Sequence, residues 1–231
     1  TLDGSKWTAK NNQSHCCDPF GREELELYLA EYARVEEGHL RLQTMLNPTT
    51  GPSRNGGTKV FNYTSGWVDT KGKFELYQGR FSANVSLPPK GATGIWPAFW
   101  LLSADYCWPT GGEIDIFEFV GGFEPRGRVY ASYHYGKECG KDLAPIPGQG
   151  YKPGSSSRDW QEDFHVYTVE WSASDIVFLV DEVEYFRRDS SQVIMPPGPL
   201  YIIFDQAVDQ TPPLRPNEKS GKYYDNPGVS L

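Results

Sequence analysis

The 231-residue chain lacks several features that would assign it to common functional classes. It has no apolar run long enough to cross a bilayer, and it has no recognisable signal peptide, so we expect any signal to have been removed. Positive charge is in the minority: 22 Lys and Arg stand against 30 Asp and Glu, which gives a net charge of −8. This balance argues against nucleic acid or an anionic membrane surface as a partner.

Cysteine is scarce, and no C-x-x-C pair occurs, which disfavours a zinc site. The four cysteines are Cys16, Cys17, Cys107 and Cys139. They allow three pairings. Glycosylation sequons begin at Asn12, Asn62 and Asn84. Sequons, cysteines and acidic charge together favour a secreted protein.

Helical periodicity is also missing, whereas strict alternation of apolar and polar residues is common. Strands are predicted at 39–46, 81–88, 128–135, 165–171, 176–186 and 199–208. Residues 22–34 could form a helix but fit a strand and turn equally well. Turn-rich segments at 47–57, 88–94 and 147–157 separate the strands. The absence of a βαβ rhythm, repeat or linker predicts one antiparallel sandwich or barrel domain over residues 1–231.

One predicted strand, GGEIDIFEFV at 111–120, carries three acids among buried-type residues. Aspartate and glutamate are poor strand formers, and an unpaired buried charge is costly. Glu113 and Asp115 share a face because side chains alternate along a strand, but Glu118 should point the other way. A β-bulge at 116–117 would return Glu118 to the first face and leave the apolar residues in the core.

Three carboxylates on one face have a chemical use. A retaining glycosidase needs two of them about 5–5.5 Å apart, one as nucleophile and one as acid/base. Crowding the acids also raises the pKa of one while another stays ionised. An acidic outer face and a calcium site are the alternatives, but calcium usually takes its ligands from loops rather than from so apolar a strand. The pattern therefore favours catalysis.

The segment GEIDIFE resembles the E-[IL]-D-x-x-E motif of glycoside hydrolase family 16, in its laminarinase-like branch. Further stretches resemble family segments in the same order: SKW (5–7), YTSG (63–66), 70–88, GIWPAFWLL (94–102), CWPTGGEIDIFE (107–118) and DFHVYTVEW (163–171). The resemblance implies an all-β, antiparallel β-jelly-roll sandwich (concanavalin-like) with a carbohydrate cleft on its concave sheet. It also implies that Glu113 is the nucleophile, Glu118 the acid/base, and Asp115 a residue that tunes the nucleophile.

Aromatic side chains stack on the apolar faces of sugars, and this chain has 7 Trp. Trp96 and Trp100 are four residues apart, so strand parity puts them on one face. The resemblance places both near the point of cleavage, and it places Trp108 in the cleft as well. Core packing is the alternative for any single tryptophan, and we assign Trp171 to the core.

His134 can be placed from a predicted hairpin between 113–119 and 129–135. A midpoint near 124–125 puts it opposite Asp115, to within a residue or so. The segment SYHYG also resembles the active-site histidine segment of the family. The same hairpin brings Cys107 and Cys139 to one end, which predicts a disulfide there. A bond between the neighbours Cys16 and Cys17 would be strained, so these either pair elsewhere or stay free.

Three further positions are candidates for binding substrate. Arg80 matches a family arginine and shares a strand face with Asn84, on which a glycan would obstruct a cleft. Glu23 and Trp67 stand where relatives commonly carry asparagine and arginine. Glu23 should disfavour sulfated or uronic substrates, and Trp67 should replace hydrogen bonding by stacking if it reaches the cleft.

The sequence thus predicts a secreted, endo-acting, retaining hydrolase of a neutral β-1,3-glucan or mixed β-1,3/1,4-glucan, and we expect a monomer. A non-catalytic β-glucan recognition protein and a galactan (agar-type) hydrolase of the same family are the alternatives. No cofactor is expected to be required. The first and last strands of the family pattern have no match in residues 1–231: either those termini are missing, or the ends differ from the family. A structural calcium, which those strands often frame, has correspondingly little support.

Overall fold

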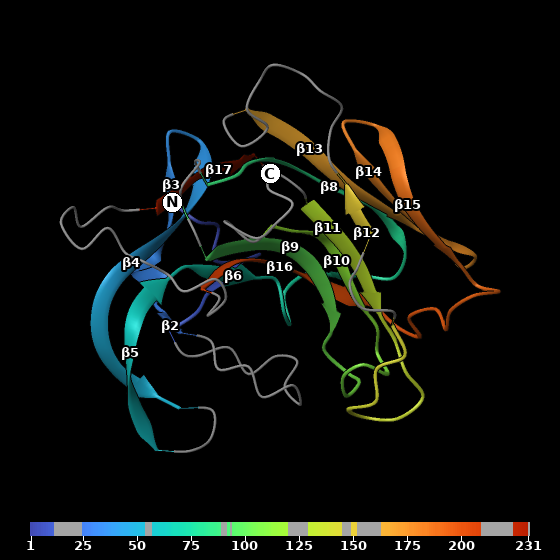
Figure 1. Ribbon diagram of the computed structural model, residues 1–231, viewed down its shortest axis with the longest axis horizontal. Helices are drawn as coiled ribbons and strands as arrows, with labels where there is room; N and C mark the ends of the chain where they lie inside the picture. The colour runs from blue at the N-terminus through green and yellow to red at the C-terminus, as the bar shows by residue number, and fades with distance from the viewer. Residues whose placement is uncertain are drawn as a thin grey trace.

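A computed structural model describes residues 1–11, 25–53, 57–88, 92, 94–119, 129–144, 149–151, 163–208 and 224–230, with only the backbone at 149–151 and 224–230. Within these ranges the chain is almost entirely β-structure, and one short 3-10 helix, η1 (Ala30–Tyr32), accompanies the strands. No helix in the described ranges is long and apolar enough to span a bilayer. The strands form two stacked sheets, with β13, β14 and β8 in one layer and β9, β16 and β10 in the other (Figure 1). The predicted antiparallel sandwich is confirmed.

The first sheet has eight strands. In spatial order they are β1 (Thr8–Ala9), β6 (Trp67–Asp69), β16 (Leu200–Val208), β9 (Ile95–Ser103), β10 (Glu113–Glu118), β11 (Val129–His134) and β12 (Gln149–Tyr151), with β7 (Glu75–Leu76) paired to β16. All of these pairings are antiparallel. This sheet carries the acid-rich strand β10 near one side and the longest pairing, β16 with β9, at its centre.

The second sheet has nine strands. In order they are β15 (Val183–Asp189), β14 (Asp175–Val180), β13 (Phe164–Trp171), β8 (Gly79–Ser86), β17 (Tyr224–Ser230), β4 (His39–Pro52), β5 (Thr58–Ser65) and β2 (Glu26–Tyr28), with β3 (Ala33–Glu36) paired to β4. The short β2 runs parallel to β5, whereas the other pairings are antiparallel. Strand β2 matters for the site, because Tyr28 reaches the first sheet.

The core lies between the sheets and is built from alternate residues of each strand. The predicted apolar face of residues 81–88 is buried as expected, with Phe81, Ala83, Val85 and Leu87 all at most 4% exposed. Aromatic contacts cross the interface, as between Phe117 of β10 and Tyr167 of β13, whose rings lie 4.4 Å apart. Trp171 belongs to the same core and is 3% exposed, as predicted.

Three local predictions are refined by the structure. Residues 22–34 include β2, η1 and β3 rather than a long helix. The run 176–186 forms two strands, because Asp181 and Glu182 take φ angles of 48° and 66° and close a tight hairpin. The turn predicted at 47–57 is shorter than expected, since β4 continues to Pro52 after a register shift between Leu46 and Thr49.

Candidate active site

The register around β10 contains the predicted bulge. Against β9, Asp115 pairs with Trp100 and Phe117 with Phe99, so Ile116 is an extra residue. Against β11, the register likewise shifts between Asp115 and Glu118. The bulge therefore lies at residues 116–117, as the sequence predicted.

The bulge sorts the side chains of β10 onto two faces. Ile114, Ile116, Phe117 and Phe119 all belong to the core between the sheets, and each is at most 2% exposed. The extra backbone carbonyl at Ile116 accepts a hydrogen bond from the hydroxyl of Tyr185, at 3.3 Å. The inserted residue is thus packed and paired, which stabilises the register that the acids need.

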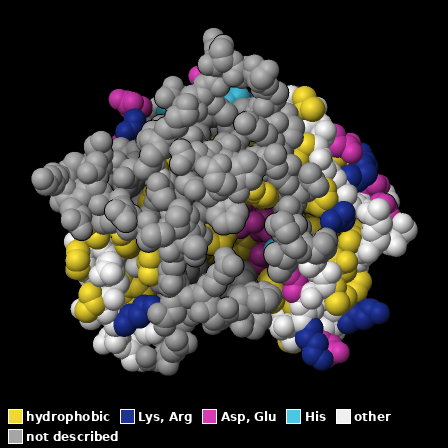
Figure 2. All heavy atoms as spheres, viewed as in Figure 1, with side chains coloured by type: hydrophobic (Ala, Val, Ile, Leu, Met, Phe, Trp, Pro, Cys, Tyr) yellow, Lys and Arg dark blue, Asp and Glu magenta, His cyan; other side chains and the backbone are white. Residues whose placement is uncertain are grey.

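Glu113, Asp115 and Glu118 consequently share the opposite face of the first sheet, which we call the acid face. The register extends this face across the sheet: Glu118 pairs with Ala98, and Ala98 pairs with Asp205 of β16. Figure 2 shows Asp and Glu side chains in a hollow near the centre of this side of the molecule. Three acids from one strand are therefore presented together, and His134 forms ion pairs with two of them, Glu113 and Asp115.

His134 links the acids to a fourth carboxylate. Its Nε2 lies 3.3 Å from Asp115 Oδ2 and 4.0 Å from Glu113 Oε1. Its Nδ1 lies 2.6 Å from Asp142 Oδ2. His134 pairs in register with Glu113 rather than Asp115, so the predicted register was wrong by two residues. The predicted face was right, because a shift of two residues preserves strand parity.

The electrostatics follow from burial and crowding. Burial and the charge of Asp115 raise the pKa of Glu113 well above its ordinary value, while His134 opposes that rise. The same causes raise the pKa of Glu118 to about 8. Burial alone would lower the pKa of His134, but the hydrogen bonds with Asp115 and Asp142 raise it to about 12. At neutral pH the site therefore holds an imidazolium and retains a proton on Glu118.

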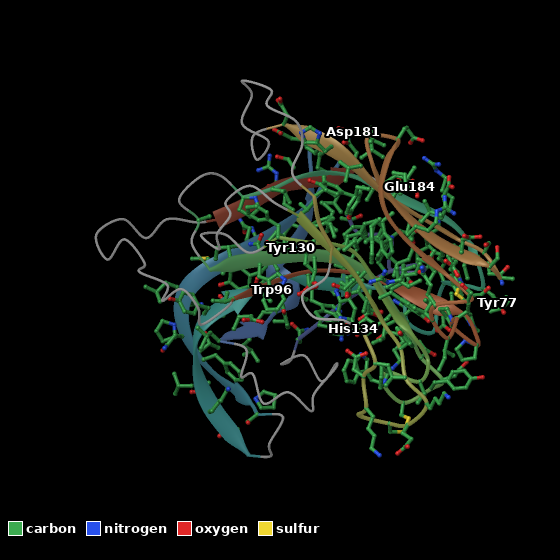
Figure 3. The ribbon with its side chains drawn as sticks, turned by 45° about the vertical axis from the view of Figure 1, so that its right-hand side comes forward. Tyr77, Trp96, Tyr130, His134, Asp181 and Glu184 are labelled. Carbon is green, nitrogen blue, oxygen red and sulfur yellow. A yellow bond between two sulfur atoms is a disulfide. The ribbon has the colours of Figure 1, made fainter. Side chains whose placement is uncertain are left out.

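All three predicted cleft tryptophans lie against these groups. Trp96, labelled in Figure 3 near His134 on the first sheet, hydrogen bonds to Glu118. Trp108 hydrogen bonds to Glu113, and its ring lies 5.9 Å from that of His134. Trp100 pairs in register with Asp115 and is 8% exposed. The structure thus brings together the three acids, His134 and these tryptophans.

Trp67 lies on the acid face but does not offer the open stacking surface that was expected. Its side chain is 1% exposed, and the ammonium of Lys10 lies 3.8 Å from its ring centroid. Its ring also packs edge-on against Trp100, and its Nε1 donates to Asp69 at 2.8 Å. The structural reason is that neighbouring side chains already cover the indole ring, so Trp67 packs beneath the site and has no open face for a sugar.

Arg80 was wrongly assigned to the site. Its strand parity was read correctly, but β8 belongs to the second sheet, and its polar side faces away from the acids. Arg80 contacts Glu170 and Glu182, each at 2.5 Å, on the outer face of that sheet. Asn84 is on the same strand face, so a glycan there would not obstruct the acid face. Glu23 lies outside the described residues, as do Cys16 and Cys17.

Sequence reasoning missed two residues of the site. Asp142 holds His134 from a segment beyond β11, and Asp205 lies two strands from Glu118. Neither residue has a local sequence signal, because Asp142 follows an irregular loop and Asp205 sits in an otherwise apolar strand. The predicted disulfide between Cys107 and Cys139 is confirmed, and it anchors the segment just before β10 to the segment that carries Asp142.

Glu113, Asp115 and His134 are also the one group of described residues with metal-ligand spacing, since their ligand atoms lie within 4.8 Å of one another. The group does not fit the calcium site that was the alternative to catalysis for these acids. Calcium takes six to eight oxygen ligands, and the imidazolium between Asp115 and Asp142 would repel it.

Comparison with known proteins places this geometry in a family. The model of the glycosyl hydrolases family 16 matches residues 4–214. A glucan endo-1,3-beta-glucosidase A1 from Niallia circulans is 28% identical over 201 residues, which cover 83% of this chain and 28% of that protein. A beta-glucanase from Rhodothermus marinus is 32% identical over 185 residues, which cover 77% of this chain and 58% of that protein. The chain therefore spans less than two thirds of the length of these relatives.

A solved structure agrees with the sequence matches. The laminarinase catalytic domain from Thermotoga maritima MSB8, in complex with cetyltrimethylammonium bromide, superposes with a TM-score of 0.78. It is 28% identical in sequence, and the match covers 97% of this chain and 89% of that one. Together with the bulged strand of three acids, these matches show that the chain belongs to the glycosyl hydrolases family 16.

Proposed function

We propose that this protein is an endo-acting, retaining glycoside hydrolase that cleaves internal bonds of β-1,3-glucans or mixed β-1,3/1,4-glucans. The observation that carries the proposal is the bulge in β10, which gathers Glu113, Asp115 and Glu118 on one face. The names of the relatives, an endo-1,3-beta-glucosidase and a beta-glucanase, support the choice of substrate.

The two glutamates divide the chemistry. Glu113 attacks the anomeric carbon as a carboxylate while Glu118 gives its proton to the departing glycosidic oxygen. The resulting ester between sugar and Glu113 is then hydrolysed by a water whose proton goes to Glu118. The raised pKa of Glu118, about 8, suits an acid that must hold its proton at neutral pH.

His134 and Asp115 condition the nucleophile. The imidazolium lies 4.0 Å from Glu113 Oε1, where it favours the ionised form that must attack. Asp115 holds the imidazole from one side at 3.3 Å, and Asp142 holds it from the other at 2.6 Å. The negative charge of Asp115 also repels a second anion, which discourages ionisation of Glu118.

Product stereochemistry tests this scheme. Proton NMR during early hydrolysis of laminarin should show the β-anomer as the first reducing end formed, because two inversions retain configuration. First release of the α-anomer would overturn the assignment of Glu113 as nucleophile. Early products of mixed, intermediate lengths would support endo cleavage, whereas glucose alone would contradict it.

The alternatives are separable by substrate. A non-catalytic β-glucan recognition protein would bind glucan without releasing reducing ends, and retention of all three carboxylates disfavours that function. An agar-type hydrolase would act on galactans. A panel of β-1,3-glucan, β-1,3/1,4-glucan and agar, measured by reducing-end release, distinguishes the three.

We further propose that the protein works outside the cell, as a monomer and without a required cofactor. The disulfide between Cys107 and Cys139 supports an oxidising compartment. Activity should therefore survive dialysis against EDTA, and the enzyme should elute from a sizing column at the mass of one chain. Loss of activity on chelation that calcium restores would instead indicate a metal requirement.

A further inference from the structure

Asp205 is a buried carboxylate on the acid face that the proposed mechanism does not use. It is 5% exposed and pairs in register with Ala98, which in turn pairs with Glu118. The backbones of Asp205 and Glu118 are thus two strands apart, or about 10 Å. Ala98 is the intervening residue in the register, and Trp96 and Trp100 flank it on the same face of β9.

Two donors converge on Asp205. The indole Nε1 of Trp100 donates to Oδ1 at 2.7 Å, and the hydroxyl of Tyr28 donates to Oδ2 at 3.1 Å. A carboxylate accepts from both donors as they stand. An amide could keep the bond from Trp100 through its oxygen, but its NH2 would then face the Tyr28 hydroxyl, which would have to turn and accept instead of donating. The two donors therefore favour an acid at position 205.

Other charged groups surround Asp205 from the neighbouring strands and from the chain's first residues. They are Asp115 and Glu118 on β10, Glu26 on β2, Asp69 on β6 and Lys10. Lys10 is the one cation among these groups: its Nζ lies 3.6 Å from Asp69 and over the ring of Trp67, and its charge also lowers the pKa of Asp205. Burial raises the pKa of Asp205 to about 7, against the lowering effect of its hydrogen bonds from Trp100 and Tyr28.

We propose that Asp205 is a positioning residue for the catalytic site: it fixes the orientation of Trp100 beside Asp115 on the acid face, and its negative charge holds the proton on Glu118. This inference rests on the proposed glycosidase function. The charge of an ionised Asp205 opposes loss of the proton from Glu118, so the acid stays competent further into the alkaline range. The interaction acts across Ala98, with no direct contact between the carboxyl groups required.

Asp205→Asn is the test, measured as kcat and KM against pH on soluble glucan. We expect KM to rise about 3- to 10-fold, the effect of losing one of the two hydrogen bonds that Trp100 and Tyr28 donate to Asp205. We also expect the alkaline limb of kcat to move down by roughly half to one pH unit. Asp69→Asn is the matched control: it breaks the same kind of contact, to Trp67 Nε1 at 2.8 Å, on a strand farther from Glu118. Asp69→Asn should leave the alkaline limb of kcat unchanged. A purely structural effect of Asp205→Asn would also leave that limb unchanged, so a shift of the limb indicates the charge of Asp205.

A readout independent of catalysis separates this inference from the proposed function. Tryptophan fluorescence of the wild type should titrate near pH 7 as Asp205 ionises beside Trp100, and Trp100→Phe should remove that transition even if Asp205→Asn does not fold. The Asp205→Asn and Trp100→Phe effects on KM should be less than additive, since both break one contact. An unshifted alkaline limb in folded Asp205→Asn, or a transition that persists in Trp100→Phe, would overturn the inference. Absence of hydrolysis by the wild type would instead overturn the proposed function. The fluorescence titration would still show whether Asp205 ionises in contact with Trp100.

Discussion

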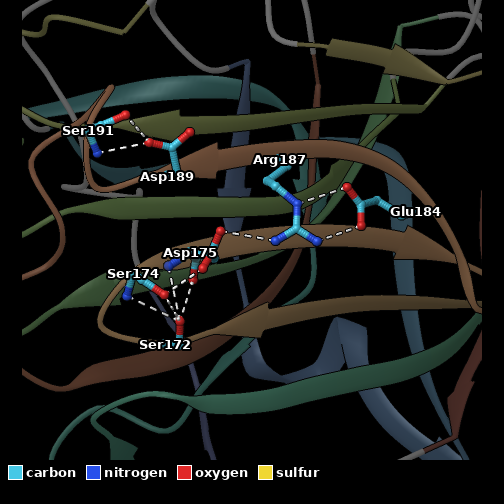
Figure 4. Close-up of polar contacts among 7 residues, drawn as sticks. All are labelled: Ser172, Ser174, Asp175, Glu184, Arg187, Asp189 and Ser191. Atoms are coloured by element: carbon cyan, nitrogen blue, oxygen red, sulfur yellow. Dashed lines mark hydrogen bonds and ion pairs between the residues drawn. The ribbon is translucent and has the colours of Figure 1, made fainter.

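The acid face and the outer face of the second sheet both carry clusters of carboxylates, but the two clusters differ in burial, in cationic partner and in the direction of their pKa shifts. On the outer face, Arg187 binds Glu184 at 2.7 and 2.9 Å and Asp175 at 3.0 Å (Figure 4). On the acid face, Glu113 and Asp115 are buried and Glu118 is half-buried, and the cationic neighbour of Glu113 and Asp115 is His134. Figure 3 shows the two regions apart, with His134 on one sheet and Glu184 on the other.

The pKa values of the two clusters move in opposite directions. The hydrogen bond from Arg187 lowers the pKa of Glu184, and hydrogen bonds from Ser174 and Arg187 lower that of Asp175. Burial and like charge raise those of Glu113 and Glu118. Carboxylates that are solvated and paired with arginine thus stay ionised and unreactive. Carboxylates that the fold buries close to one another have raised pKa values, which suits them to catalysis.

The largest expected effect is that of Glu113→Gln. An amide cannot serve as the nucleophile, so kcat should fall by at least about 10³-fold while the fold persists. The matched change on the outer face, Glu184→Gln, should alter kcat by less than about twofold. Assays of reducing-end release compare the two variants. Equal losses of kcat would contradict a catalytic role that is confined to the acid face.

Deletion of Phe117 should come next, because it removes the bulge. The acids would then have to change face or the core residues would have to leave the core, since a shift of one residue reverses every side chain. We expect an inactive and destabilised protein, by circular dichroism and activity. A stable deletion variant with full activity would show that the bulge is not needed to align Glu118.

Asp142→Asn should reduce kcat/KM by roughly 10- to 100-fold, the range for a hydrogen bond to a charged group. Oδ1 accepts from the backbone N–H of Ala144 at 3.0 Å, and the amide oxygen can keep that bond. The new NH2 then faces His134 Nδ1, which also carries a proton, so the imidazolium loses its support. Thermal melts check that the variant folds, and a folded variant with unchanged kcat/KM would exclude Asp142 from the site.

Glu118→Gln should change how stability depends on pH. The pKa of Glu118 is about 8 in the folded state and 4.5 ordinarily, so its protonated form stabilises fully below pH 4.5 and that contribution is lost as pH rises through 8. Glutamine does not titrate, so the variant does not lose this contribution to stability as pH rises. The free energy of unfolding of the variant relative to the wild type should rise by about 1–3 kcal/mol between pH 4.5 and 8. Urea titrations at both pH values measure it, and a flat difference would contradict the raised pKa.

The smallest expected effect is that of Arg80→Ala. Its guanidinium is exposed and bound to Glu170 and Glu182 on the far sheet, so kcat/KM should stay within about twofold of the wild type. A large rise in KM on long glucans alone would show that the outer face takes part in binding the polymer.

Prediction from sequence succeeded where the reasoning was local. Alternation located the strands, and the spacing of Glu113, Asp115 and Glu118 required the bulge that is observed. The prediction failed for Arg80 because it depended on which of the two sheets contains the strand. It failed for Trp67 because it depended on how closely other side chains pack against the indole ring. Strand parity gives a face but not which of two sheets that face belongs to.

The sequence by itself determined the strand class, the bulge and the three carboxylates, because period and spacing act within a single strand. Only the tertiary structure decided that His134 is held by Asp142 and that Asp205 faces Glu118 across Ala98. Those pairings depend on register between strands far apart in the chain. They also set the pKa values, since burial and neighbouring charge exist only once the sheets have packed.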